Sequence, residues 1–243
     1  MTWVVAHTDS IPSLWAGEIT RLQWAGASSG GMVFARPPDR KSVEWLFTPA
    51  VAGNRTSTQV GGFEISFSPM MSVLAAAFAA GPDCLDAVVA AHRAAVDRAL
   101  VMWERHATVV RLDVGTGVEW CPAVGLAALA DSEISSERRT VHTRVYVPAK
   151  APALHDALWR PLVPERFLDW QQYGWDEYHH TLAAGLNSTL GWEFEHRDST
   201  RTPWGAPALE LAGVPEQRIG ARIRPALRAL ADGPAVGSVA PAH

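Results

Sequence analysis

Residues 62–80 read GFEISFSPMMSVLAAAFAA and combine two periodicities in one short segment. Apolar and polar residues alternate over residues 63–67, which is typical of a β-strand with one face on a core. Ser68-Pro69 breaks the alternation, and the alanine- and leucine-rich run that follows predicts a helix over residues 72–80, ended by Gly81-Pro82. A strand, a proline turn and a helix in direct succession favour a mixed fold in which helices pack on a sheet.

The rest of the chain adds further strands and helices to this unit. A long helix is predicted over residues 85–107, because apolar residues recur there at three- and four-residue steps. The other expected elements are an irregular strand-containing lobe at 1–62, strands at 109–112, 118–120, 126–129 and 141–147, a polar loop at 132–140, and helices at 175–190 and from Val214. These elements predict an α+β fold, organised as a single domain over residues 1–231 with a disordered tail at 232–243.

The composition limits the classes of function. The chain has 243 residues, 21 basic and 25 acidic, so its net charge is −4 and its pI is about 6.1, which argues against a strongly basic nucleic-acid-binding protein. Only Lys41 and Lys150 are lysines, whereas there are 11 tryptophans. The longest apolar run, residues 73–80, is far shorter than the roughly 20 residues of a membrane span. Because the N-terminus also lacks the features of an export signal, we expect a cytoplasmic protein with no membrane partner.

Four segments carry a family pattern when they are taken in order: GFEISFSP at 62–69 followed by Ser72-Val73, AHRAAV through WERHA at 91–107, VHTRVYV at 141–147, and AGVPE at 212–216. Together they resemble the relaxase domain of the MobF class of conjugative relaxases, the TrwC/TraI type. In that family these segments are a strand with a serine-proline-lysine-serine-valine turn, a long helix, a strand with His-x-His metal ligands, and a late helix start. The resemblance covers roughly residues 60–225 and implies a relaxase-like antiparallel sheet with flanking helices.

The resemblance also shows which chemical groups have changed. A relaxase uses a tyrosine nucleophile near its N-terminus and three imidazoles that hold a divalent cation, but the first tyrosine of this chain is Tyr146. The His-x-His motif reads His142-x-Arg144, and a guanidinium cannot coordinate a metal. Asp131 stands where the family has its remaining histidine, and Met71 replaces the turn lysine. The expected nucleophile, metal ligands and phosphate contact are therefore all altered, and we expect no metal.

These changes favour a repurposed site, and the chain is similar to the single-domain Pictet-Spengler cyclases of bacterial β-carboline biosynthesis, the marinacarboline type. That resemblance implies condensation of L-tryptophan or a close derivative with an aldehyde, by a homodimer that needs no cofactor and has no nucleic acid partner. The implied catalytic residues are Glu104, as acid and base, and His142, which would assist proton transfer. The implied substrate-binding residues are Arg144, which would hold the amino-acid carboxylate, Asp131, Phe67 and Met71.

Two other functions remain open. The chain can be a catalytically dead relaxase-like module that binds DNA or a conjugative-transfer partner. It can also be an active relaxase that uses Tyr146 or Tyr173 with a rearranged metal site. Each site residue has a structural alternative as well: a solvent-facing Glu104, a core His142, and an Arg144 paired with Asp131 or Glu133.

Overall fold

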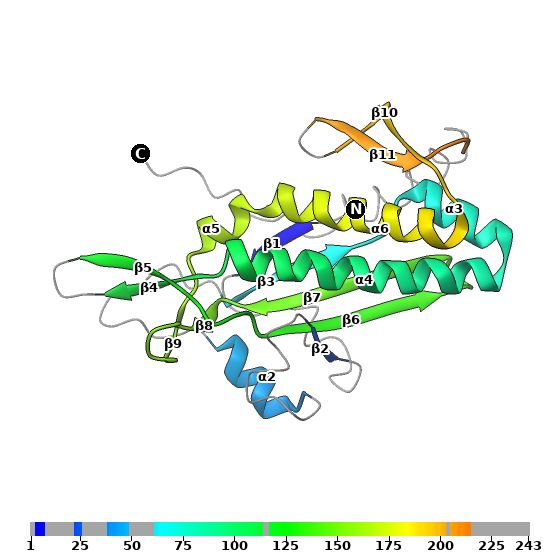
Figure 1. The fold of residues 1–243 in the computed structure, drawn as a ribbon. Coiled ribbons are helices and arrows are strands. Elements are labelled where there is room, and N and C mark those ends of the chain that lie inside the picture. Colours follow the sequence, from blue (N-terminus) through cyan, green and yellow to red (C-terminus); the bar gives the residue numbers. More distant parts are fainter. Residues whose placement is uncertain are drawn as a thin grey trace.

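The computed structural model describes residues 3–7, 22–25, 38–48, 61–113, 117–202 and 205–214. In chain order the elements are β1 (Trp3–His7), β2 (Gln23–Ala25), α2 (Arg40–Phe47), β3 (Gly62–Phe67), α3 (Met71–Ala80), α4 (Pro82–His106), β4 (Val109–Asp113), β5 (Val118–Pro122), β6 (Ala128–Ser135), β7 (Thr140–Pro148), β8 (Lys150–Pro152), β9 (Trp159–Pro161), α5 (Pro164–Asp169), α6 (Gln171–Leu190), β10 (Phe194–Arg201) and β11 (Pro207–Leu211). Figure 1 shows their arrangement, which confirms the predicted α+β class. The predicted tail and the helix expected from Val214 lie outside the described residues, apart from Val214 itself.

Five strands form one antiparallel sheet in the order β1-β3-β7-β6-β2. The central strand β7 pairs with β3 on one side and with β6 on the other. The N-terminal strands β1 and β2 form the two edges, so the strand-containing lobe expected at residues 1–62 contributes strands to both edges of the main sheet. Residues 132–135, predicted to lie in a loop, continue β6 because they pair with the first residues of β7.

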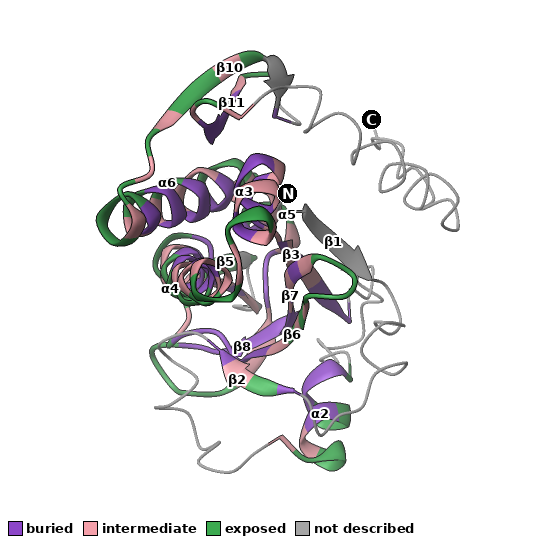
Figure 2. Ribbon diagram, turned by 90° about the vertical axis from the view of Figure 1, so that its right-hand side faces the viewer, coloured by how far each residue is buried: buried purple, intermediate pink, exposed green. Residues whose placement is uncertain are grey.

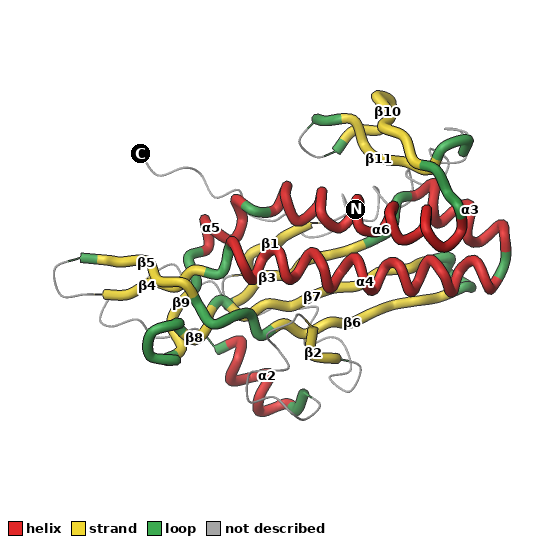
Figure 3. The backbone as a smooth tube through the Cα atoms, viewed as in Figure 1, coloured by secondary structure: helices red, strands yellow, loops and turns green. Residues whose placement is uncertain are grey.

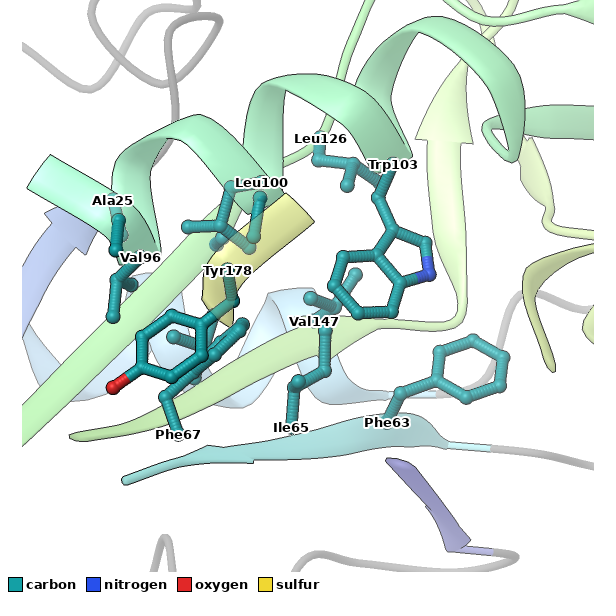
Figure 4. Packing of buried hydrophobic residues seen from close by; sticks show 14 of the residues in the cluster. Ala25, Phe63, Ile65, Phe67, Val96, Leu100, Trp103, Leu126, Val147 and Tyr178 are labelled. Atoms are coloured by element: carbon teal, nitrogen blue, oxygen red, sulfur yellow. The ribbon is translucent and has the colours of Figure 1, made fainter. Parts of the chain in front are cut away.

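Helices α4 and α6 pack against each other and cover one face of this sheet (Figures 1 and 3). The alternating strand β3 places its three aromatic and aliphatic side chains, Phe63, Ile65 and Phe67, under these helices, and all three are fully buried (Figure 4). Trp103 of α4 is also fully buried, and it lies so close to α6 that a Cβ atom at Gly174 would come within 2.1 Å of its ring. Only glycine fits at that crossing, so the close approach of α4 and α6 depends on it.

A turn at Gly81 separates α3 from α4. Gly81 has a φ of 107°, which a residue with a side chain rarely adopts, and Pro82 then begins α4 at the position where its missing N–H costs nothing. This corner confirms the stop signal read from the sequence, and it allows α3 to fold back against α4.

One polar network lies within the otherwise apolar layer between the helices and the sheet. His92 of α4 shares hydrogen bonds with the Tyr178 hydroxyl, 2.6 Å from its Nδ1, and with the Thr143 hydroxyl, 2.8 Å from its Nε2. Thr143 in turn shares a hydrogen bond of 2.9 Å with Ser132 on β6. Burial is the main reason that the pKa of His92 is lowered to about 3, and electrostatic repulsion from His142, the chain N-terminus and Arg93 contributes in the same direction. The imidazole is therefore neutral at physiological pH and ties α4, α6 and the sheet together.

The opposite face of the sheet has a smaller cover. Helix α2 packs Val43, Leu46 and Phe47 against Leu129 and Tyr146 of the sheet. Figure 2 shows this helix on the side of the sheet away from α4 and α6. Lys150, one of the two lysines, donates hydrogen bonds to the carbonyl oxygens of Trp45 and Thr48 and holds the end of this helix. Burial lowers the pKa of Lys150.

Three two-stranded ribbons, β4–β5, β8–β9 and β10–β11, extend from this body. The ribbon β10–β11 was not predicted, and it is held to α3 by Ser72, whose hydroxyl donates to the Glu210 carboxylate and accepts from the Leu211 amide at 2.9 Å. Among the described helices, none is long and apolar enough to cross a membrane.

Candidate functional site

Three of the predicted site residues meet on the sheet face opposite α4 and α6. Asp131 of β6 and Arg144 of β7 are direct cross-strand partners, and His142 is the next residue of β7 on the same face. His142 has Glu133 as its own cross-strand partner. The structure therefore groups Asp131, His142 and Arg144 on one face of the sheet, as the sequence resemblance predicts.

Arg144 lies on the central strand between carboxylates from both neighbouring strands. Its Nε is 4.0 Å from Oε1 of Glu64 on β3, and Asp131 faces it from β6. The Arg144 side chain is 40% exposed, so this ion pair is partly screened by solvent. The arrangement fits the structural alternative of an arginine that balances nearby carboxylates.

His142 is held by a neighbouring hydroxyl. Its Nδ1 lies 2.8 Å from Oγ of Ser68, which follows β3 directly. The pKa of His142 is lowered to about 4, chiefly by burial and also by the positive charges of Arg144 and the chain N-terminus, while the negative charge of Glu133 acts in the opposite direction. The imidazole is neutral at physiological pH and can exchange a proton only in acid.

The other three predicted site residues lie in the helical layer. Phe67 is fully buried under the helices and contacts the Trp103 and Tyr178 rings, with centroid distances of 6.3 and 5.2 Å. Glu104 is half-buried on α4, and Met71 is the half-buried first residue of α3. Because the sheet separates α4 from the face that carries Arg144, Glu104 and Phe67 do not join His142 in one site.

The residues at the expected metal position do not fit a divalent cation. Arg144 brings a permanent positive charge and no lone pair to that position, beside a single imidazole and carboxylates. Within the described ranges, no group of three or more His, Cys, Asp or Glu side chains is arranged to hold a metal ion. No step of the chemistry is therefore assigned to a metal at this site.

The three tyrosines differ in accessibility. Tyr146 and Tyr178 are buried, whereas Tyr173 near the start of α6 is 58% exposed. Tyr173 packs on Trp170, with ring centroids 4.9 Å apart, and Trp170 stacks on His106 at 4.8 Å with the rings 12° from parallel. Arg105 and Arg166, on the same helix ends, are exposed and have no ion pair with another described residue.

Sequence reasoning missed this group of stacked rings. His106 ends α4 and is 64 residues before Trp170, so no local spacing connects them. The only sequence signal for this group was the three-residue spacing of Trp170 and Tyr173, which places two side chains on the same side of a helix. That signal was not used, because the predicted helix began at residue 175, whereas α6 begins at Gln171.

Comparison with known proteins identifies the class to which this sheet and its helices belong. The TrwC relaxase family matches residues 7–222, and the chain belongs to that family. A comparison with curated proteins gives no match. Among solved structures, the metal-bound conjugative relaxase TrwC in complex with oriT DNA has a TM-score of 0.73 at 19% identity, covering 99% of this chain and 86% of that one. TrwC with a 27-mer DNA comprising the recognition hairpin and the cleavage site has a TM-score of 0.72 at 19% identity, covering 98% and 86%.

These findings confirm the relaxase-like antiparallel sheet with flanking helices and correct two predictions. The Pictet-Spengler cyclase, with its alkaloid-biosynthesis setting and its tryptophan-like and aldehyde substrates, is wrong, because both comparisons lead to conjugative relaxases. The exclusion of nucleic acid as a partner is contradicted as well, because the solved structures that share the fold contain oriT DNA. The acidic net charge misled on this point, since charge summed over a whole chain does not describe one surface.

Proposed function

We propose that this protein is a relaxase-fold module that binds single-stranded DNA without cleaving it through a tyrosine and a metal ion. The family match and the DNA in the related structures support binding. The observation that carries the proposal is Arg144, which stands between two carboxylates at the position where the family resemblance places a metal ligand. The protein therefore keeps the sheet of the family, but with an arginine at this position it lacks the metal ligands that cleavage would need.

The tyrosines support the same conclusion. Tyr146 and Tyr178 are buried and cannot reach a phosphodiester, and burial raises the pKa of Tyr178 well above its ordinary value. Tyr173 is exposed, but it belongs to α6, and the sheet lies between α6 and Arg144. A nucleophile and a phosphate-activating cation must act on one phosphorus atom, so Tyr173 is in the wrong layer to work with the residues around Arg144.

The stacked rings of His106, Trp170 and Tyr173 are the DNA contact that the described surface supports best. Proteins that bind single strands combine aromatic platforms, on which bases stack, with cations that meet the phosphates. The three rings offer such a platform, and two exposed arginines are near it in the sequence: Arg105 directly precedes His106 in α4, and Arg166 precedes Trp170 by about one helical turn in α5. This contact needs no lysine-rich groove, which agrees with a chain that has only two lysines.

Binding can be measured by fluorescence anisotropy with a labelled single-stranded oligonucleotide of mixed sequence and a duplex of the same sequence. We expect the single strand to bind more tightly, with an affinity that falls as salt rises from about 20 to about 200 mM. No binding of either DNA at the lowest salt would contradict the proposal and would favour a module that contacts a protein of the transfer complex.

A further inference from the structure

A cysteine, a histidine and an aspartate lie next to one another where β5 meets the turn between β8 and β9, and none of them belongs to the site around Arg144. Sγ of Cys121, on β5, lies 3.7 Å from Nδ1 of His155, and Nε2 of the same imidazole lies 3.1 Å from Oδ2 of Asp156. His155 and Asp156 belong to the turn between β8 and β9. A nucleophile within reach of a base, which is itself oriented by a third group, is the geometric pattern of covalent catalysis.

Backbone hydrogen bonds hold the two segments together. The Leu154 amide donates to the Pro122 carbonyl at 2.9 Å, and the Val124 amide donates to the Pro152 carbonyl at 2.8 Å. The position of the imidazole beside the thiol therefore follows from the pairing of β5 with the β8–β9 turn and does not depend on a flexible side chain alone. Ala157 in this turn has a φ of 57°, a strained conformation for a residue that is not glycine.

The hydrogen bonds define the role of each atom. Burial raises the pKa of Asp156, but hydrogen bonds from the Leu158 amide and the Arg160 guanidinium, together with the charges of Arg160 and His155, lower it more. The pKa of Asp156 is therefore below its ordinary value, and the carboxylate is ionised. Because Nε2 lies 3.1 Å from this carboxylate, the tautomer with its proton on Nε2 is favoured, and it leaves the lone pair of Nδ1 on the side of the thiol. Sγ also lies 3.3 Å from the Pro122 carbonyl, so the thiol proton has two acceptors.

The group is accessible to a substrate. His155 is 50% exposed, and Cys121 is half-buried. Leu154 and Leu158, on either side of the histidine and aspartate, are 63% and 58% exposed, so apolar side chains border the group in the turn. These side chains favour a substrate with an apolar portion over a highly charged one.

We propose that Cys121, His155 and Asp156 form a nucleophilic thiol centre that accepts acyl groups from activated esters or thioesters. The Cys121 proton passes to Nδ1 of His155 while Sγ bonds to the acyl carbon. The bond between that carbon and the leaving alcohol or thiol breaks, and the leaving group takes the proton from Nδ1. Water then releases the acid and restores the thiol. This centre does not depend on the proposed DNA binding.

Cys84 provides an internal control, because it is the second of the two cysteines and is also half-buried. Burial raises the pKa of Cys84, so its thiol should react slowly. The two residues can be compared in one sample by brief alkylation with iodoacetamide at pH 7 and mass spectrometry of the two peptides. A free thiol is only about 3% thiolate at this pH, so assistance by His155 can raise the alkylation rate of Cys121 by about 10- to 30-fold over a model peptide thiol.

Two variants separate activation from accessibility. His155→Gln should reduce the alkylation rate of Cys121 to that of the model thiol, whereas Leu154→Ser, a change in the neighbouring exposed residue, should leave it unchanged. The thermal unfolding temperature should be the same in both, because both side chains are largely exposed. A Cys121 rate that is equal in His155→Gln and in the unchanged protein would overturn the proposal.

The acyl step has its own readout. Incubation with p-nitrophenyl acetate and with a short-chain acyl thioester should add an acyl mass to the Cys121 peptide, and hydrolysis should be lost in Cys121→Ser. No adduct on Cys121 with either reagent, or equal labelling of Cys84, would overturn the assignment of an acyl-accepting centre.

Discussion

The two faces of the central sheet differ in how much freedom their residues have. On the helix-bearing face, β3 and β7 place mostly apolar side chains against α4 and α6, and the polar Thr143 shares a hydrogen bond with His92 of α4, which has a partner at each ring nitrogen. On the opposite face, the same strands carry the oppositely charged Glu64 and Arg144 and the neutral His142 in a partly exposed cluster. Because side chains alternate along a strand, the first face can preserve the fold while the second changes its chemistry. Such a division accounts for a chain that retains the TrwC fold at 19% identity with altered site residues.

The largest effect is expected on the helix-bearing face. Trp103→Ala removes a fully buried indole that packs against Gly174 and Phe167, and it should lower the free energy of unfolding by about 3–5 kcal/mol. Urea denaturation measures this change. Trp120→Ala is the matched control, because that indole is 66% exposed and its loss should cost under about 0.5 kcal/mol. Equal losses in the two variants would show that the face covered by α4 and α6 does not dominate stability.

Acid should weaken the same face through its buried histidine. The pKa of His92 is about 3 in the folded protein, below its ordinary value, so the unfolded chain binds more protons between these two values. The contribution of the neutral His92 to the free energy of unfolding is therefore fully present above about pH 6.5 and is lost as the pH falls. At pH 4.5 the loss should be about 2–3 kcal/mol.

The variant His92→Gln retains hydrogen-bonding groups and removes this titration. Urea denaturation at pH 7 and pH 4.5 should therefore show a smaller difference in the variant than in the unchanged protein. The same difference in both proteins would mean that His92 does not titrate on unfolding, contrary to its burial.

A third effect concerns the platform at the helix ends. Tyr173→Ala should weaken single-stranded DNA binding by about 1–3 kcal/mol, because one stacking ring is lost. Tyr173→Phe is the matched control and should bind as the unchanged protein does, because it keeps the ring and loses only the hydroxyl. Anisotropy titrations give both values, and an unaltered affinity in Tyr173→Ala would remove the platform from the DNA contact.

The smallest effect should appear on the opposite face. Arg144→Met removes a guanidinium that is 40% exposed and 4.0 Å from its carboxylate partner, so the free energy of unfolding should change by less than about 1 kcal/mol. The same urea series tests this value. A loss comparable to that of Trp103→Ala would abolish the contrast between the two faces.

The main helices and the central strands could be predicted from the sequence, because their periodicities are long or flanked by strong stop signals. The alternation at 63–67 and the Gly81-Pro82 corner are examples, and both are observed. The ribbon β10–β11 escaped prediction because Phe194–Arg201 is largely polar and has no alternating pattern. Strands were expected within residues 1–62, but β1 and β2 were not placed, because their pairing partners β3 and β6 lie far along the chain.

The candidate site was predicted only in part. The spacing of the family motifs predicted that Asp131, His142 and Arg144 lie close together, and the pairing of β6 with β7 places them so. Family spacing does not say on which side of the sheet a residue lies, so Phe67 and Glu104 were added to a site from which the sheet separates them. Cys121 and His155 are 34 residues apart, and no spacing pattern could have connected them before the β5 contact with the β8–β9 turn was known.

One measurement tests most directly whether this family member binds DNA without cutting it. The protein is incubated with an end-labelled single-stranded oligonucleotide and Mg²⁺ or Mn²⁺, and each sample is divided between a native gel and a denaturing gel. We predict a shifted complex on the native gel, and on the denaturing gel an intact oligonucleotide with no covalent protein–DNA adduct. A shortened oligonucleotide together with a covalent adduct that is lost in Tyr173→Phe would contradict this prediction and would identify an active relaxase.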